Sequence, residues 1–203
     1  MSSYEDEMRE IASRCDAIPD KISLGTLRYL WQAGPFALNK SESLPRFLSQ
    51  MSIFKTFSGY ELKSLSEFLH RRRFARGEVV FKQGDIGYGF YLVFSGQINI
   101  IHVSGTSSDF KEHHVAKILP SQYFGEMGLL EDLNRRSATA VCGEDTVLLG
   151  LFKPDLEALL DKHPTVGAKF MRELALILAQ RLGSVISEVS ALRHRLADLE
   201  AKK

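Results

Sequence analysis

Apolar and polar residues alternate with two different periods along the chain, and each change of period marks a change of structure. From residue 44 to 70 the apolar residues recur at helical spacing, and Ser58 stands where an N-cap would begin a helix. From 74 to 103 short apolar runs are separated by glycine turns, which is typical of β-strands. Another strand-like run follows at 146–152, and the pattern is helical again from residue 153. The chain is therefore predicted to hold an all-β sandwich, barrel or jelly roll flanked by helices.

The C-terminal helical pattern carries a heptad seam. Its apolar residues are spaced alternately four and three apart, at Leu178, Leu182, Val185, Val189, Leu192, Leu196 and Leu199. With Val189 at an a position, the flanking positions pair Glu188 with Arg193 in opposite charge across a parallel dimer. Arg195 and Glu200 form a second such pair. A helix packed on its own domain could show this stripe, but the stripe continues past the length that one small domain covers, so we predict a parallel homodimer.

The segments outside these patterns are predicted from their composition. Residues 1–20 carry six acids against two arginines and are expected to form an exposed helix. Residues 22–32 have a second helical pattern, which packs on the core or docks on a partner. The basic run 71–73 is expected at a solvated edge leading into a strand, and 104–112 is expected to form a polar loop.

Overall composition limits the class of protein. The 203 residues are 44% hydrophobic with a formal net charge of +1, which gives no global attraction to nucleic acid or to an anionic membrane. The N-terminus lacks the pattern of a secretory signal, and no apolar run approaches the roughly 18 residues of a membrane span. Cys15 and Cys142 do not make a disulfide or zinc framework. We therefore expect a cytoplasmic protein without membrane contact.

Neither a metal site nor a catalytic site is indicated. His102, His113 and His114 lie beside or within the predicted polar loop, without a supporting cysteine or carboxylate pattern, so they are interpreted as surface residues. The chain has no nucleophile elbow, Walker loop or paired-carboxylate arrangement. We expect no metal ligands, no catalytic residues and no enzymatic activity.

The strongest chemical signal is the segment 124–140, FGEMGLLEDLNRRSATA. Gly125 has no Cβ, so its backbone can approach a ligand and take dihedral angles that other residues avoid. The carboxylate of Glu126 is suited to accept hydrogen bonds from a pair of sugar hydroxyl groups. The guanidinium of Arg136 can bind two phosphate oxygens at once, with the Ser137 hydroxyl and N–H beside it. The segment therefore predicts a pocket for a sugar-phosphate ligand.

At these residues the sequence resembles the cyclic nucleotide-binding domain family, in particular its bacterial catabolite-activator branch. The family's phosphate-binding cassette has the form F-G-E-[LM]-[AG]-L, a variable loop, and R-[AS]-[AS]-[AT]. The matching residues are Phe124, Gly125, Glu126, Met127, Gly128, Leu129, Arg136, Ser137, Ala138 and Thr139. One departure is that Asn134-Arg135 stands where many members have a proline before the arginine. Arg136 is chosen as the ligand-binding arginine because Ser-Ala-Thr follows it directly.

The resemblance implies a role for each part of the site. Glu126 would hold the ribose 2′-OH, Arg136 the cyclic phosphate, and Ser137 a further phosphate oxygen. The cassette residues Phe124, Gly125, Met127 and Ala138 complete this part of the predicted ligand-binding set. The base would lie against Val115 and Ile118 and would be closed over by the C-terminal helix at Val185, Ile186 and Ser187.

The resemblance also implies the fold and the function. The predicted class is α+β, an antiparallel β jelly roll flanked by N-terminal helices and a long C-terminal coiled-coil helix. The expected divisions are a helical extension at 1–43, the cyclic nucleotide-binding jelly roll with its entry helices at 44–163, and a dimerisation helix at 164–203.

The predicted function is a receptor for cAMP, with cGMP possible, that dimerises and signals to a downstream protein partner or an appended domain. Because nothing after the helix corresponds to the helix-turn-helix of catabolite activators, no direct DNA binding is expected. Two alternatives stay open: an adaptor dimer that binds no nucleotide in the cell, and the regulatory segment of a larger enzyme.

Overall fold

The computed structural model describes residues 44–105, 111–130 and 135–200, so the predicted N-terminal extension 1–43 lies outside the described residues. Its elements in chain order are α3 (Leu44–Gln50), η1 (Ser52–Phe54), α4 (Gly59–Ser66), β1 (His70–Phe74), β2 (Val79–Phe81), β3 (Gly89–Ser95), β4 (Ile98–Ser104), β5 (Lys111–Ile118), β6 (Tyr123–Phe124), α5 (Met127–Leu130), β7 (Thr139–Cys142), β8 (Thr146–Phe152), α6 (Lys153–Lys162) and α7 (Pro164–Glu200).

The strands form two four-stranded antiparallel sheets that pack face to face. The strand orders are β1-β8-β3-β6 in the first sheet and β2-β7-β4-β5 in the second, so the chain crosses repeatedly from one sheet to the other. Side chains from both sheets fill the space between them: Phe74, Tyr91, Val93, Ile98, Phe124, Ala140, Cys142, Leu148 and Phe152. The predicted α+β class, with an antiparallel jelly roll between helices, is confirmed.

A second core lies between the outer face of the first sheet and the helices. Phe90 of β3 packs edge-on against Phe170 of α7, with their ring centroids 5.9 Å apart, and Phe54 stacks on Phe170 at 6.3 Å. Leu174 of α7 is also fully buried in this cluster. The first turns of α7 therefore belong to the packed core of the molecule. The predicted division between the jelly-roll domain and a dimerisation helix at residue 164 stays a prediction.

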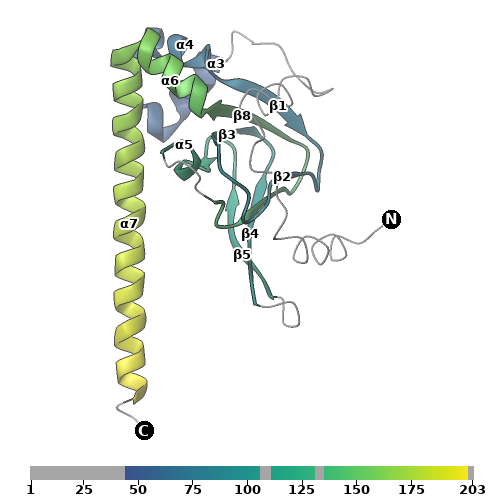
Figure 1. The fold of residues 1–203 in the computed structure, drawn as a ribbon, viewed down its shortest axis with the longest axis vertical. Helices are drawn as coiled ribbons and strands as arrows, with labels where there is room; N and C mark the ends of the chain where they lie inside the picture. The colour runs from purple at the N-terminus through teal and green to yellow at the C-terminus, as the bar shows by residue number, and fades with distance from the viewer. Residues whose placement is uncertain (1–43, 106–110, 131–134, 201–203) are drawn as a thin grey trace.

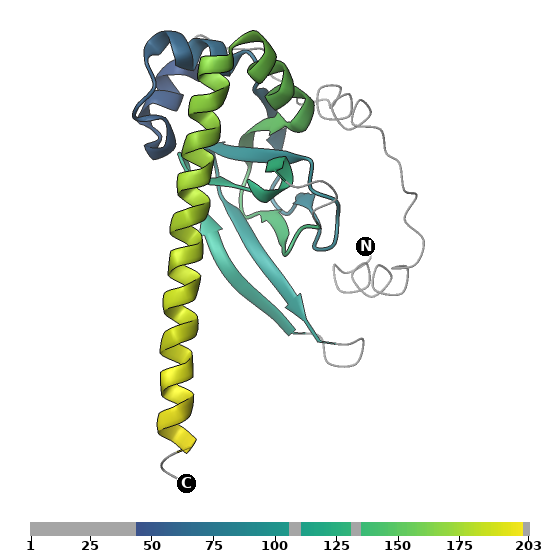
Figure 2. The ribbon, with the colours of Figure 1, turned by 60° about the vertical axis from the view of Figure 1, so that its left-hand side comes forward.

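The second half of α7 leaves the body of the molecule. In Figures 1 and 2 the helix runs past the jelly roll and projects beyond it, and every residue from 181 to 200 is exposed. The exposed side chains include the seam residues Leu182, Val185, Val189, Leu192, Leu196 and Leu199. By length and composition alone α7 would also qualify as a membrane span, because its most apolar 18-residue stretch has a mean hydropathy of 1.3. A single helix of this kind is weak evidence for a membrane.

One prediction about the strands was wrong at the basic run 71–73. These residues do not lead into a strand but form the middle of β1, which pairs with β8. The arginine side chains are accommodated on aromatic rings: the guanidinium of Arg71 lies 4.2 Å from the ring centroid of Phe94, and that of Arg72 lies 4.3 Å from the centroid of Phe74. Long side chains that cover apolar surface in this way allow a charged run to be a sheet edge.

The predicted polar loop 104–112 is also too long. Ser104 and Lys111 form the last pair of the β4–β5 ladder, which makes a two-stranded ribbon projecting from the jelly roll (Figure 2). His113 and His114 are accordingly strand residues of β5. The strand ends at the tip of this exposed ribbon, Ser104 and Lys111-Glu112, are polar, so their composition does not distinguish them from a loop. No group of three or more potential metal-ligating side chains occurs in the described ranges.

The start of α4 gives a stability prediction. Ser58 is the N-cap of α4, as predicted, and it forms a capping box with Glu61. The Glu61 carboxylate also accepts a 2.8 Å hydrogen bond from Lys169 of α7. Hydrogen bonding to Lys169, followed by that to the Ser58 backbone, lowers the pKa of Glu61 from its ordinary value. A carboxyl group with a lowered folded-state pKa stabilises the fold above its unfolded pKa of about 4.3, and this contribution is lost as the pH falls.

The variant Glu61→Gln is expected to isolate this ion pair, because glutamine retains the capping box. Above pH 5 it should lower the free energy of unfolding by up to about 1 kcal/mol, the range of a partly exposed pair. Urea titrations at several pH values measure this difference, which should shrink as the pH falls below about 4. A difference that is constant from pH 7 to pH 3 would contradict the assignment.

Candidate functional site

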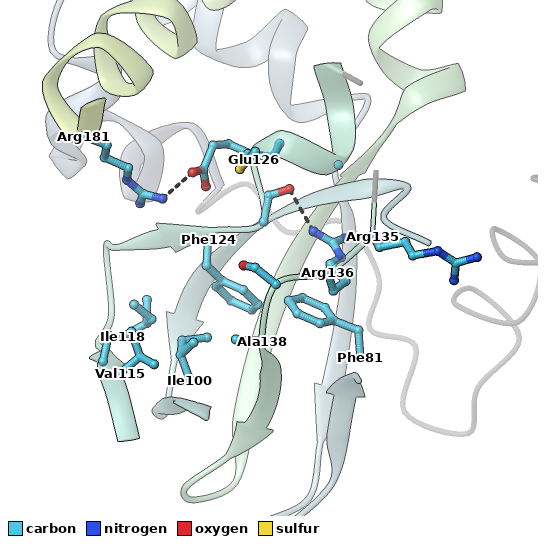
Figure 3. A pocket seen from close by; sticks show the side chains of 15 residues that line it. Phe81, Ile100, Val115, Ile118, Phe124, Glu126, Arg135, Arg136, Ala138 and Arg181 are labelled. Carbon is cyan, nitrogen blue, oxygen red and sulfur yellow. Dashed lines mark hydrogen bonds and ion pairs between the residues drawn. The ribbon is translucent and has the colours of Figure 1, made fainter. Parts of the chain in front are cut away.

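A cavity of about 330 Å³ opens between the cassette, the β4–β5 ribbon and α7. It contains nine of the twelve predicted ligand-binding residues: Val115, Ile118, Phe124, Gly125, Glu126, Met127, Arg136, Ser137 and Ala138. Figure 3 shows how segments far apart in the sequence supply its wall, with Phe81 from β2, Ile100 from β4 and Arg181 from α7. The fold therefore brings the cassette together with an apolar wall and one helix.

Arg136 lies at the base of the cavity and is only 7% exposed. Its Nη1 donates to the Gly125 carbonyl at 3.0 Å and its Nη2 to the Gly89 carbonyl at 2.8 Å. The guanidinium lies 4.1 Å from the ring centroid of Phe81, and its Nε–H is buried without a partner. Burial lowers the pKa of Arg136, while a hydrogen bond with Tyr91 and the carboxylates of Glu126 and Asp85 oppose this shift. The site thus holds a fixed cation with hydrogen-bonding capacity left over.

Gly125 allows this arginine to come close to the chain. Its φ of +79° is in the left-handed region, and an added Cβ would lie 2.7 Å from Nη1 of Arg136. Both the dihedral angle and the space therefore require glycine here. A single helical turn follows at once as α5, beginning at Met127.

Glu126 is the second buried charged group of the site, with 4% exposure. Its Oε1 forms an ion pair with Nη1 of Arg181 on α7, while its Oε2 is buried without a partner (Figure 3). The Arg181 side chain is half exposed and lies over the ring of Tyr123, 5.8 Å from the centroid. One carboxylate oxygen thus connects the cassette to α7, and the other has unused acceptor capacity.

The structure also shows which of the two adjacent arginines faces inward. Arg136 points into the base of the site. The exposed Arg135 also borders the cavity, but its side chain extends away from it and donates to the Gly84 carbonyl at 2.9 Å (Figure 3). The backbone of Arg135 forms an isolated bridge with Ile86, which fixes this orientation.

The opposite end of the cavity is apolar. Ile100 of β4 lies beside Val115 and Ile118 of β5, with Phe124 and Ala138 nearby (Figure 3). The pocket therefore has a polar end built from the cassette and an apolar end built from the ribbon, which suits a ligand with an anionic group and a flat, weakly polar ring.

Three predicted residues do not line the cavity. Val185, Ile186 and Ser187 lie further along α7, where Val185 and Ile186 are more than half exposed. Their contact with a base stays a prediction. The α7 residue that does reach the cavity is Arg181, one turn earlier, which the sequence analysis missed. The sequence did offer a signal for this contact. Arg181 directly precedes the seam residue Leu182, and a buried carboxylate such as Glu126 requires a cation nearby.

Ile100 and Phe81 are further cavity residues that were not predicted. Phe81 was correctly predicted to lie in a strand. Its position over Arg136 depends on the pairing of β2 with β7, which is set by the sheet topology. Nothing in the local sequence indicates this long-range contact.

Comparisons with known proteins agree with this geometry. A family model described as "Cyclic nucleotide-binding domain" matches residues 71–163. The cyclic AMP receptor protein of Thermus thermophilus is 36% identical over 152 residues, which cover 71% of this chain and 66% of that protein. The cAMP-dependent protein kinase regulatory subunit of Dictyostelium discoideum is 32% identical over 106 residues, which cover 52% of this chain and 32% of that protein.

Among solved structures, the crystal structure of the Thermus thermophilus catabolite activator protein superposes with a TM-score of 0.62 at 35% identity, over 69% of this chain and 62% of that one. The chain thus spans about two thirds of the length of the receptor and about one third of the kinase subunit. The matched sequence, the jelly roll and the cassette agree, and the chain belongs to the cyclic nucleotide-binding domain family.

Proposed function

We propose that the chain is a cytoplasmic receptor for a cyclic nucleotide, with cAMP the first candidate, that dimerises through α7 and signals to a partner protein or an appended domain. One observation carries the proposal: two buried charged groups, Arg136 and Glu126, line the same cavity, and each has one polar atom without a partner. Buried polar groups without partners are rare and costly in folded proteins, so a ligand that supplies both partners would be bound strongly.

The ligand would lie along the cavity from its polar to its apolar end. Arg136 neutralises the cyclic phosphate, and Ser137 adds a hydroxyl and an N–H. The free Oε2 of Glu126 accepts the ribose 2′-OH. The base then packs against the apolar wall at Ile100, Val115 and Ile118, while Phe124, Gly125, Met127 and Ala138 enclose the sugar and phosphate.

The preference for cAMP over cGMP rests on two features. Ser137 stands where some cGMP-binding relatives carry threonine, and the apolar wall offers no acid or arginine for the edge of guanine. Similarity to proteins named as a cyclic AMP receptor and as cAMP-dependent kinase subunits supports the same choice. cGMP remains the alternative ligand.

Ligand binding would be coupled to the dimer contact and to the downstream partner through α7. A 2′-OH on Oε2 of Glu126 changes the surroundings of the ion pair between Oε1 and Arg181, which connects the cassette to the helix. A ligand shifts a conformational equilibrium only by its differential affinity for the two states, and this ion pair gives it a means of distinguishing them. The exposed seam on the same helix would carry the dimer contact.

The adaptor alternative is disfavoured by the same buried charges, because a protein that binds no ligand gains nothing from leaving them without partners. The alternative that this chain is the regulatory segment of a larger enzyme involves the same ligand site. It differs from the proposal only in the target of the signal, which would be a catalytic domain of the same enzyme. The absence of direct DNA binding stays a prediction.

Glu126→Ala tests the ribose contact. The wild-type protein should bind cAMP about tenfold or more tightly than 2′-deoxy-cAMP, because hydrogen bonds to charged groups contribute about 1.5–3 kcal/mol. The variant should bind the two ligands with nearly equal Kd. The control Leu130→Ala, at an exposed position of α5 that does not line the cavity, should keep the discrimination. A Glu126→Ala protein that still prefers cAMP tenfold would contradict the assignment. Calorimetric titration with both ligands measures the ratio of the two Kd values for each of the three proteins.

A further inference from the structure

Ser137 is released from the sheet at the point where β7 begins. The last pair of the β4–β7 ladder is Ile101↔Thr139, and continuing that register by two residues would place Ser137 opposite Val103. An antiparallel ladder continued to that pair would engage backbone groups of both residues. The ladder does not continue, so the backbone of Ser137 needs other partners.

The side chain of Gln83 takes the place of Ser137 in that ladder. Its Nε2 donates to the Val103 carbonyl at 3.0 Å, and its Oε1 accepts from the Val103 N–H at 2.8 Å. A side-chain amide thus satisfies both backbone groups of Val103, as a neighbouring strand would. Ser137 is thereby left free to face the cavity, which it lines.

His102 then holds the released segment. Its Nδ1 lies 2.9 Å from the Ser137 carbonyl oxygen, and since a carbonyl can only accept, Nδ1 carries the proton. His102 is two residues from the cavity residue Ile100 along β4 and so lies on the same face of the ribbon. Within the described ranges the N–H and hydroxyl of Ser137 make no hydrogen bond, so His102 fixes only its carbonyl side.

We infer that His102 is a positioning residue of the ligand site: by holding the Ser137 carbonyl, it orients the Ser137 N–H and hydroxyl toward a phosphate oxygen of the ligand. This inference rests on the proposed function and adds to it a part for the β4–β5 ribbon in phosphate binding. Preorganised donors bind an anion more strongly because they need no reordering on binding. The ligand class is therefore a phosphodiester whose individual oxygens are distinguished.

Three variants test the inference. His102→Ala removes the hydrogen bond, His102→Asn restores it because the asparagine amide nitrogen occupies the same branch position as Nδ1, and His113→Ala is the control. His113 pairs with His102 across the ribbon but contacts the Ser104 hydroxyl instead. We expect His102→Ala to raise the Kd for cAMP about threefold to tenfold, as for the loss of one hydrogen bond, and the other two variants to remain near wild type.

The two phosphorothioate diastereomers of cAMP separate positioning from general damage. Each carries sulfur, a poor acceptor, in place of one exocyclic phosphate oxygen. His102→Ala should weaken the diastereomer that keeps oxygen at Ser137 several-fold more than the other, whereas a loss of folding would weaken both equally. Wild-type affinity in His102→Ala, or equal losses for both diastereomers, would overturn the inference alone. A wild-type protein that binds no cyclic nucleotide would overturn the proposed function and the inference with it.

Discussion

Replacing Arg136 by alanine should lower the affinity for cAMP by at least about a hundredfold. The substitution removes the buried cation of the cavity and with it the charge-assisted hydrogen bonds to the phosphate, which together exceed about 3 kcal/mol. It also removes the bonds to the Gly125 and Gly89 carbonyls, so the variant should unfold at a lower temperature than wild type.

Two further variants distinguish lost binding from lost folding. Arg136→Lys keeps the charge but not the planar fork, and it should still bind cAMP at least about tenfold more weakly than wild type. Arg135→Ala changes the exposed neighbour, which borders the cavity but extends away from it and bonds to the Gly84 carbonyl. It should leave the Kd within about twofold. Titration calorimetry gives the affinities, and circular dichroism gives the Tm of each variant. Equal losses at both positions would contradict the orientation of the two arginines.

Replacing Val189 by aspartate should convert a dimer into a monomer. Val189 is at the centre of the exposed seam of α7 and would lie at an a position of a parallel coiled coil, where a buried charge on each of two helices is strongly unfavourable. Sedimentation equilibrium at micromolar concentration should show about twice the chain mass for wild type and a single chain mass for the variant.

The matched control is Ser190→Asp, which places the same charge on the next residue, outside the seam. It should remain dimeric, because only the a and d positions are buried between the helices. Both variants should retain the Tm of the folded body, since α7 packs in the core only through its first turns, up to Ile177. A wild-type monomer at these concentrations would contradict the dimer.

The cassette could be predicted from the sequence because its chemistry is local. Gly125, Glu126 and the Arg136-Ser137 pair occur within one short segment, and the left-handed φ of Gly125 is a property that its residue type allows directly. The strands around it were also predicted from their apolar runs and glycine turns. Binding by these residues nevertheless stays a proposal.

What the sequence could not give depends on contacts between distant segments. Phe81 reaches Arg136 only because β2 pairs with β7, and Arg181 reaches Glu126 only because α7 packs across the sheet at one particular helical phase. A helical pattern does not define that phase to a single residue, so Arg181 could not be identified from the sequence, and the contacts at 185–187 stay a prediction. Similarly, the opening of the ladder at Ser137 depends on a glutamine more than fifty residues earlier in the chain.

The central claim is that this chain binds a cyclic nucleotide in the cavity between the cassette and α7. Calorimetric titration of the purified protein with cAMP and with cGMP, accompanied by thermal unfolding, tests it most directly. We predict saturable binding of one cAMP per chain at micromolar or lower Kd, weaker binding of cGMP, and a raised Tm with cAMP, because a ligand that binds only the folded state stabilises it. No heat of binding and no change in Tm with either nucleotide would contradict the claim.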